Sequence, residues 1–343
     1  MGQIFKNHKK QNFLKKILIV GTGEIAQRHY KNILKLNKNF QIDFFTRKKN
    51  TKQKLKNTNF ISNFKKAVNT NYFAAILCNP APYHLKFAIP LAKNGTNLYI
   101  EKPITSDNIK DSISLLKLSK KKKITLQVGY NLLYLNSLKY LKNLIKKDRL
   151  GKIRIVKVNT GYYLPLWRQK NYRDTVSANK KLGGGVLLEL SHEFNYLIWL
   201  FGLPSYIFAQ TGKISNLNID VEDFANVLFK FKKNINSSCN LDFINKEYTR
   251  KLEIIADKVN ITWDYKKNTI IERSFSSNKI RKLKFKKTDT YSLSLIHFLN
   301  LCKNKKTSKD VIDAINTNRI VKYAKKSANL NKSMMLRKKD FSI

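Results

Sequence analysis

Residues 16–26 read KILIVGTGEIA, an aliphatic run that ends in a glycine-rich turn. The β-branched residues of 17–20 predict a buried strand, and apolar residues at helical spacing over 27–36 predict the helix that follows. A strand, a tight turn with two glycines and a helix, in that order, are typical of the start of a dinucleotide-binding domain. The stretch therefore predicts an α/β fold for the first part of the chain.

Each small residue of this turn has its own role in such a domain. Gly21 permits the sharp turn, Gly23 lets the backbone approach a pyrophosphate, and Ala26 lets the helix pack on the strand. The N-terminus of the helix adds N–H groups and a dipole that stabilise phosphate charge. The expected pyrophosphate-binding segment is Gly21, Thr22, Gly23, Glu24 and Ile25.

The rest of the first half repeats the alternation of strand and helix. Strands are expected over 41–45, 73–78, 97–100 and 124–128, and helices over 83–94 and 109–120. This alternation predicts a doubly wound parallel sheet with helices on both faces, the Rossmann architecture. Because the pattern changes after Val128, we expect the dinucleotide-binding domain to span 1–128.

The second half, 129–343, has the pattern of an α+β domain. Alternating apolar residues over 153–159 and at intervals between 206 and 271 predict an open, mostly antiparallel sheet. Helices are expected over 137–147, from the glycine triplet at 183–185 to Phe201, and over 294–301 and 310–327, with a polar loop over 171–181. The last helices can pack back on the first domain.

The formal charge is +46, from 68 Lys and Arg against 22 Asp and Glu. These cations are dispersed along the chain, without zinc-finger spacing or an aromatic–basic RNA-binding signature, so we expect no specific nucleic-acid partner, only salt-sensitive sticking. Three scattered cysteines form no disulfide or metal pattern, and we expect no metal site. Since the sequence contains neither a bilayer-length apolar run nor a signal-peptide pattern, we expect a cytoplasmic protein with no membrane partner.

The end of the second strand bears on the choice of cofactor. In NAD-binding domains an acidic residue there holds the ribose 2′-hydroxyl. Here the strand is followed by Thr46 and Arg47, and Asp43 lies inside it. Because a guanidinium suits phosphate geometry, Thr46 and Arg47 are candidates to hold the 2′-phosphate of NADP, which favours NADP over NAD. The alternative is that Arg47 is one more surface cation.

Two further strand ends carry short motifs, NPAPYH at 79–84 and EKPIT at 101–105. Together with ILIVGTGEIAQRH, VGYN, GGGVLLELSHEFNYLIWLFG and HFLNLC, they resemble the Gfo/Idh/MocA family of NAD(P)-dependent oxidoreductases over nearly the whole chain. The loop LPLWRQKNYRDTVSA is similar to a branch associated with surface-polysaccharide and nonulosonic-acid gene clusters. The resemblance implies cofactor contacts from Asn79, Pro80, His84, Glu101 and Lys102.

The resemblance also implies catalytic roles. Lys102 matches the family's active-site lysine beside the nicotinamide, and His192 matches the histidine that accepts the substrate's hydroxyl proton. Many relatives carry an aspartate four residues before this histidine, whereas here Glu189 lies three before it. Positions i and i+3 share a helix face, so Glu189 can orient or charge-tune His192; equally, it can cap a strand or bridge to Arg173.

The substrate-binding residues are expected on the loops of the second domain. The candidates are Tyr130, Asn131, Tyr163, Trp167, Arg168, Tyr172 and Arg173; the alternative is that they pack the loop itself. Arginine with aromatic rings suits an anionic or sugar ligand. An arginine that relatives often carry after VGYN is missing from the segment Leu132-Leu133-Tyr134, which puts that substrate contact in doubt.

These residues predict an NAD(P)-dependent oxidoreductase that transfers hydride between the nicotinamide and a carbinol carbon of a sugar or nucleotide sugar. The resemblance implies a substrate-binding second domain whose open sheet pairs subunits into a homodimer or homotetramer. Two alternatives stay open: a cofactor-retaining epimerase or lyase of the same family, and a nucleotide-binding sensor without catalysis. The presence of both Lys102 and His192 argues against the sensor.

Overall fold

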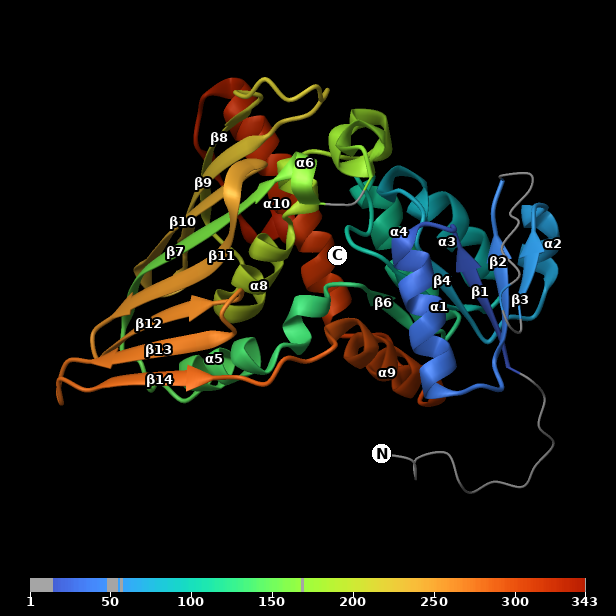
Figure 1. Cartoon of the computed structure of the whole chain (residues 1–343), viewed down its shortest axis with the longest axis horizontal. Helices are drawn as coiled ribbons and strands as arrows, with labels where there is room; N and C mark the ends of the chain where they lie inside the picture. Colours follow the sequence, from blue (N-terminus) through green and yellow to red (C-terminus); the bar gives the residue numbers. More distant parts are fainter. Residues whose placement is uncertain (1–14, 48–54, 56–57, 168–169, 343) are drawn as a thin grey trace.

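The computed structural model describes residues 15–47, 55, 58–167 and 170–342, and consists of two lobes, each built on a β-sheet (Figure 1). In the described part of the chain, the first sheet has six parallel strands in the order β3-β2-β1-β4-β5-β6. The strands are β1 (Lys16–Val20), β2 (Gln41–Phe45), β3 (Thr58–Ile61), β4 (Ala74–Leu77), β5 (Asn97–Ile100) and β6 (Leu126–Val128). This is the strand order of the Rossmann fold, and the predicted fold class is confirmed.

The core of this lobe has two layers, one on each face of the sheet, and alternate side chains of β1 point into each. Ile17 and Ile19 point into a cluster with α1 (Glu24–Leu36), whereas Leu18 and Val20 point to the other face, where α3 (His84–Lys93) and α4 (Ile109–Lys121) pack. The first cluster also contains Leu295, Phe298, Leu299 and Cys302 of α9 (Thr290–Lys303), which lies beside α1 (Figure 1). A helix from near the C-terminus therefore completes the core of the first lobe.

The second sheet has nine strands among the described residues, in the order β14-β13-β12-β11-β7-β10-β9-β8-β15. Its strands are β7 (Ile153–Tyr163), β8 (Tyr206–Gly212), β9 (Phe224–Phe231), β10 (Ile235–Asp242), β11 (Ile244–Ala256), β12 (Val259–Asp264), β13 (Thr269–Ser274), β14 (Ile280–Lys284) and β15 (Met334–Met335). All neighbours are antiparallel except the parallel pair β7–β10. The predicted mostly antiparallel sheet is confirmed.

Helices cover the side of this sheet that faces the first lobe (Figure 1). They are α5 (Asn136–Lys146), α7 (Val186–Glu189), α8 (His192–Phe201) and α10 (Asp310–Leu330). On the opposite side lie the residues that alternate with the core residues along each strand. In β9, for example, Ala225, Val227 and Phe229 are buried, and Leu228 between them is 47% exposed. In the described part of the chain, that side carries no helix (Figure 1).

Several predicted elements differ from those observed. α1 begins three residues before the predicted start, and both β3 and α2 (Phe64–Asn69) were not predicted. The single helix predicted from the glycine triplet to Phe201 is wrong, because the chain forms α7 and α8 with a break at Leu190 and Ser191. Leu190 has φ −97° and ψ 27°, outside helical values, so the direction changes just before His192. The expected polar loop at 171–181 contains three short 3₁₀ turns.

Candidate active site

The predicted cofactor residues follow different strands of one parallel sheet. Gly21 follows β1, Thr46 follows β2, Asn79 lies just beyond β4 and Glu101 follows β5. Because the carboxyl ends of parallel strands meet at one edge of a sheet, these residues gather there, where such folds bind ligands. The fold therefore brings together predicted cofactor residues from segments that are far apart in the chain.

The glycine turn has the shape that a pyrophosphate needs. Gly21 has φ +106°, and a Cβ on it would lie 3.2 Å from the backbone of Cys78, so only glycine fits without strain. Gly23 caps α1 without a side-chain hydrogen bond, and a Cβ on it would enter open space. The N-terminus of α1 is thus open to an anion. Thr22 and Ile25 are partly exposed, and the exposed Glu24 lies 3.9 Å from Lys170.

The end of β2 offers a cation and no free carboxylate among the described residues. Asp43 is buried, and its carboxylate accepts hydrogen bonds from Tyr72 (2.6 Å) and Asn59 (3.0 Å), so both of its oxygens already have partners within the protein. Thr46 is buried, and its backbone N–H donates to Ile61. Arg47 is exposed, with its guanidinium carbon 5.9 Å from the ring centre of Phe87.

His84 fixes the loops that follow β4 and β5. Its ring nitrogens lie 2.7 Å from the carbonyl oxygen of Asn79 and 2.9 Å from that of Pro103. Burial lowers the pKa of His84, whereas the two carbonyl contacts act in the opposite direction because a carbonyl oxygen accepts only from a protonated ring nitrogen. His84 therefore positions the predicted cofactor loop Asn79-Pro80 while lying beneath it. The partly buried Asn79 donates its amide to the carbonyl of Pro80.

Glu101 is buried and points toward α1. Its Oε1 lies 2.6 Å from Nε2 of the fully buried His29, and its Oε2 accepts a 3.3 Å hydrogen bond from the backbone N–H of Lys102. A Cβ on Gly129 would lie 3.0 Å from Oε2, so that glycine makes room for the carboxylate. The sequence analysis did not identify His29, because its partner lies 72 residues away and no local pattern marks the pair. This pair links the middle of α1 to the loop that carries Lys102.

Lys102 joins the two lobes. Its Nζ donates a 2.9 Å hydrogen bond to the backbone carbonyl of Glu189 and lies 3.9 Å from Oε1 of the same residue. The carboxylate of Glu189 accepts a 2.7 Å hydrogen bond from Ser177. The glycine triplet permits this approach, since a Cβ on Gly184 would lie 2.3 Å from the carbonyl of Val176. Glu189 thus shares the site with Lys102, and Ser177 is a site residue that sequence reasoning missed.

His192 is the first residue of α8, and Lys102 is close enough for its charge to act on the imidazole. His192 is partly buried, with its ring edge-to-face against Tyr130 at 5.5 Å between ring centres. Burial, Lys102 and Arg250 together hold the pKa of His192 well below its usual range. A neutral imidazole beside an ammonium is a proton acceptor next to a group that stabilises a negative oxygen.

Not all predicted substrate residues lie beside His192. Tyr130 is buried beside His192 and its hydroxyl donates to Ser191 (3.3 Å). Asn131 is also buried, and its amide donates to Thr290 of α9 (2.7 Å), which suits a structural role. Tyr163 alternates with Tyr162, so it lies on the open side of the second sheet.

The remaining candidates lie on the loop after β7. Trp167 stacks on Tyr162 at 4.7 Å between ring centres. Tyr172 is partly buried, and its hydroxyl accepts a hydrogen bond from the backbone of Asn218. Arg173 is exposed, with its guanidinium 5.8 Å from the ring centre of Tyr172. Arg168 lies outside the described residues.

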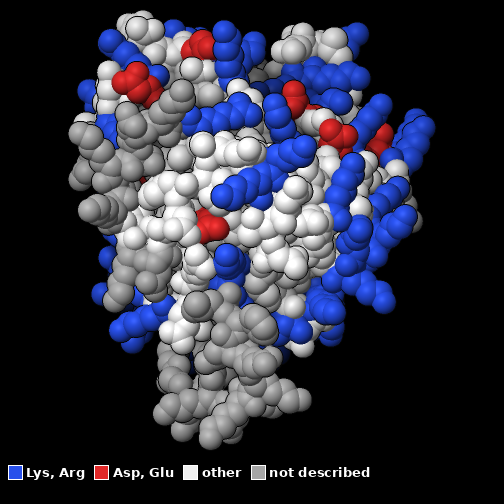
Figure 2. Space-filling model, turned by 90° about the vertical axis from the view of Figure 1, so that its right-hand side faces the viewer, with Lys and Arg blue, Asp and Glu red and all other residues white. Residues whose placement is uncertain are grey.

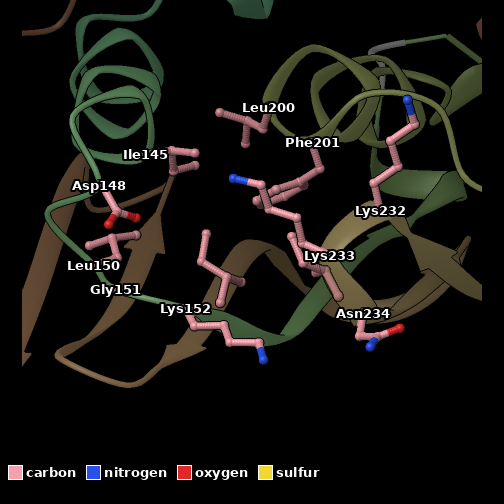
Figure 3. A pocket seen from close by; sticks show the side chains of 12 residues that line it. Ile145, Asp148, Leu150, Gly151, Lys152, Leu200, Phe201, Lys232, Lys233 and Asn234 are labelled. Carbon is pink, nitrogen blue, oxygen red and sulfur yellow. The ribbon is translucent and has the colours of Figure 1, made fainter.

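A separate cavity of about 560 Å³ lies at the other end of α8, nine residues and about 14 Å of helix away from His192 (Figure 3). Its lining includes Ile145, Leu200, Phe201 and Lys233. The C-terminal ends of α5 and α8 carry partial negative charge there, which suits lysines and disfavours a phosphate. This cavity is therefore distinct from the site at the strand edge.

The face of the molecule in Figure 2 is basic without a single stripe. Figure 2 shows one face, where Lys and Arg are spread between pale areas and a few acidic residues. Among the described residues, no group of three or more His, Cys, Asp and Glu side chains is placed to hold a metal ion. None of the helices in the described ranges is long and apolar enough to cross a membrane.

Comparisons with curated proteins find partial matches. An uncharacterized oxidoreductase of Synechocystis sp. is 26% identical over 130 residues, 38% of this chain and 34% of that protein. The 2,7-anhydro-N-acetylneuraminate hydratase of Escherichia coli K12 is 27% identical over 142 residues, 41% of this chain and 37% of that protein. The chain therefore spans little more than a third of the length of these curated relatives.

Comparisons with solved structures cover almost the whole chain. Levoglucosan dehydrogenase in complex with NADH superposes with a TM-score of 0.82 at 14% identity, over 94% of this chain and 99% of that one. The myo-inositol 2-dehydrogenase from Lactobacillus plantarum gives a TM-score of 0.78 at 17% identity, with the same coverage. At such identities the likeness establishes the fold.

Family models match both lobes. Residues 15–130 match the oxidoreductase family with an NAD-binding Rossmann fold, and residues 138–262 match the GFO/IDH/MocA C-terminal domain. The two matches follow one another in the order of the two lobes. This chain therefore belongs to the GFO/IDH/MocA family of oxidoreductases, as its sequence motifs predicted.

Proposed function

We propose that this protein transfers hydride between a nicotinamide cofactor and a carbinol carbon of a sugar or nucleotide-sugar derivative. One observation supports the proposal: Lys102 of the first lobe and His192 of the second lie near one another where the two lobes meet, on the loop after β5 and at the start of α8. A neutral imidazole can accept the proton of an alcohol, and an ammonium can stabilise the negative charge on its oxygen.

The residues divide the proton chemistry between them. The bound nicotinamide supplies the hydride acceptor or donor. During oxidation His192 accepts the hydroxyl proton as the carbon–hydrogen bond breaks, and Lys102 stabilises the negative charge that develops on the oxygen. Glu189 of the second lobe holds Lys102, and Ser177 in turn donates a hydrogen bond to the carboxylate of Glu189. In the reverse direction, the imidazolium returns the proton to the carbonyl oxygen.

The residues that hold the cofactor are those around the glycine turn. The open N-terminus of α1 and the backbone of Gly21 to Ile25 suit the pyrophosphate, and the loop positioned by His84 suits the nicotinamide side. Arg47 supports a preference for NADP, because Asp43 is committed to Tyr72 and Asn59. The substrate contacts that fit this placement come from Tyr130, Trp167, Tyr172 and Arg173.

The test is a cofactor-linked assay with a panel of polyols that includes myo-inositol, levoglucosan and nucleotide sugars. Each compound is mixed with NADP or NAD, and nicotinamide absorbance is followed together with the product. Formation of a ketone with an equal amount of reduced cofactor supports the proposal. Conversion of a panel compound without net cofactor reduction contradicts it.

A second candidate function is a cofactor-retaining elimination or epimerisation. The observation that favours it is the partial match to a protein named a hydratase. In that case the cofactor would be reduced and reoxidised within each turnover, so the same assay would show product without net absorbance change. Deuterium at the oxidised carbon would then return to the product instead of remaining on released cofactor.

We further propose a homodimer or homotetramer formed through the open side of the second sheet. Ile155 (40% exposed) and Leu228 (47% exposed) lie on this side, between polar strand residues. Light scattering after size exclusion would give the mass of the particle. A monomer at micromolar concentration would contradict the proposal. The cytoplasmic location and the role in surface-polysaccharide synthesis stay predictions.

A further inference from the structure

A buried ion pair lies directly behind His192. Glu193 follows His192 in the first turn of α8 and is fully buried, and Arg250 of β11 is 6% exposed. The Nε of Arg250 lies 2.7 Å from Oε1 of Glu193. Neither residue was identified in the sequence, since they are 57 positions apart and belong to different elements.

Contacts from two other segments hold this pair in place. The hydroxyl of Thr160 in β7 donates a 3.0 Å hydrogen bond to Oε1 of Glu193. The guanidinium of Arg250 lies between two rings, 5.7 Å from the centre of Tyr162 and 5.4 Å from that of Tyr265. A planar guanidinium between aromatic faces has little rotational freedom. The first turn of α8 is therefore fastened to the sheet at this point.

Stability alone gives a poor reason for such a pair. Burying two charges costs desolvation energy that their attraction only partly offsets, and apolar replacements of buried pairs are often neutral or stabilising. Moreover, Oε2 of Glu193 and Nε of Arg250 are buried without a hydrogen-bond partner in the described part of the chain. The pair is thus incompletely satisfied, which adds to its cost in stability.

Two cations act on His192, Lys102 on the loop after β5 and Arg250 on β11. Glu189 of α7 and Glu193 of α8 pair with these cations, and the uncharged ring of Tyr130 packs against the imidazole. The N-terminus of α8 adds a positive dipole end at His192 itself. Lys102 and Arg250 both act against a charged imidazole, in the same direction as burial.

We propose that Arg250 and Glu193 are a positioning pair for His192: the pair fastens the first turn of α8 to β11 and so fixes the place of the imidazole. The charges of the pair also act on the protonation of His192. The proposal rests on the proposed function for its catalytic meaning. Its electrostatic part does not, because the protonation of His192 can be measured without any substrate. In this role Glu193 partly offsets the charge of Arg250, so removing either charge alone shifts the pKa of the His192 imidazole.

The test is a pH titration of the full-length protein labelled with ¹⁵N-histidine, with the His192 signals assigned by comparison with His192→Ala. Arg250→Met removes the nearby cation and is expected to raise the pKa of His192 by about 1. Glu193→Gln leaves that cation uncompensated and is expected to lower it further. The double variant should return near the wild-type value.

Arg154→Met is the matched control. Arg154 is also an arginine of the second sheet in an ion pair, 2.9 Å from Asp257, but it is half-exposed and lies at the start of β7. It loses the same charge and should leave the titration of His192 unchanged. Thermal unfolding of every variant reports whether the fold is retained.

Arg250→Lys separates charge from geometry and covers the case in which Arg250→Met does not fold. It keeps the cation but loses the planar fork, so the pKa of His192 should stay near wild type while the hydride-transfer rate falls. Opposite shifts in Arg250→Met and Glu193→Gln support the pair. No shift, shifts in one direction, or an equal shift in the control would overturn it. If no panel compound is oxidised but the opposite shifts appear, the proposed function fails and the electrostatic coupling stands.

Discussion

Two regions of the site are built in opposite ways. One is the pyrophosphate turn, and the other is the wall around His192, formed by Lys102, Glu189, Glu193 and Arg250. The turn comes from one contiguous segment, 20–26, in which each residue type has a local steric reason. The wall is assembled from β5, α7, α8 and β11, which meet only in the folded chain. The comparison teaches that the turn proposed to bind the pyrophosphate is encoded locally, whereas the surroundings of His192 depend on pairs that are far apart in sequence.

The largest expected effect is on the wall side. His192→Ala removes the proton acceptor, and positioned proton transfer contributes about 10²–10⁴-fold, so turnover should fall within that range. Cofactor affinity should be unchanged, because His192 lies in the second lobe. Steady-state rates with a direct cofactor titration as control check this. A loss below about tenfold would remove His192 from the proton step.

The next effect concerns the part of the nucleotide that distinguishes NADP from NAD. Hydrogen bonds to charged groups contribute about 1.5–3 kcal/mol, so Arg47→Ala should weaken NADP binding by roughly 10- to 150-fold. NAD has no 2′-phosphate and should bind as before. Isothermal titration of both cofactors is the measurement, and Lys170→Ala serves as a surface-charge control. Equal weakening of both cofactors, or a wild type that prefers NAD, would show that Arg47 is not the selector.

A smaller effect separates the two glycines of the turn. Gly21→Ala forces a side chain into a left-handed conformation against the backbone of Cys78, which should cost about 1–3 kcal/mol of unfolding free energy. Gly23→Ala projects a methyl group into open space, so it should leave stability nearly unchanged and weaken cofactor binding instead. Denaturant unfolding and cofactor titration of both variants check this division. The reverse pattern would mean that the turn does not face the pyrophosphate.

The smallest effect concerns the dispersed charge, which belongs to neither region. With +46 spread over the chain, binding to DNA should ignore sequence and fall about tenfold or more between ~0.05 and ~0.2 M salt. Fluorescence anisotropy with two unrelated duplexes measures both properties. Tight binding to one duplex alone at ~0.2 M salt would point to a nucleic-acid function.

The sequence predicted the features that depend on local pattern. Aliphatic runs marked β1, β4 and β5, whereas the helical spacing over 27–36 placed the start of α1 three residues too late. β3 was missed because TNFI is a short edge strand in which none of the residues is fully buried, so it lacks the apolar run of a central strand. The break at Leu190 was missed because LELSHEF has uninterrupted helical spacing.

Site residues followed the same division. Lys102 and His192 were identified through motifs, whereas His29, Ser177 and Arg250 were not. The contacts of these three cross from one element to another: His29 to Glu101, Ser177 to Glu189 and Arg250 to Glu193. Such pairs are set by the packing of elements within each lobe, and no periodicity in a single segment indicates them. The contact between the two lobes shows that Glu189 interacts with Lys102, which helical spacing alone did not indicate.

The most direct test is single-turnover hydride transfer, followed at the nicotinamide band, in Lys102→Ala, His192→Ala and the double variant. Removing one electrostatic partner of a developing oxyanion typically costs about 10²–10³-fold, and the loss of His192 should be comparable or larger. Because both residues act on one oxygen, the double variant should lose less than the product of the two single losses, with cofactor binding intact in all three. Independent, multiplicative losses, or losses below about tenfold in both single variants, would contradict a shared role of Lys102 and His192 at the substrate oxygen.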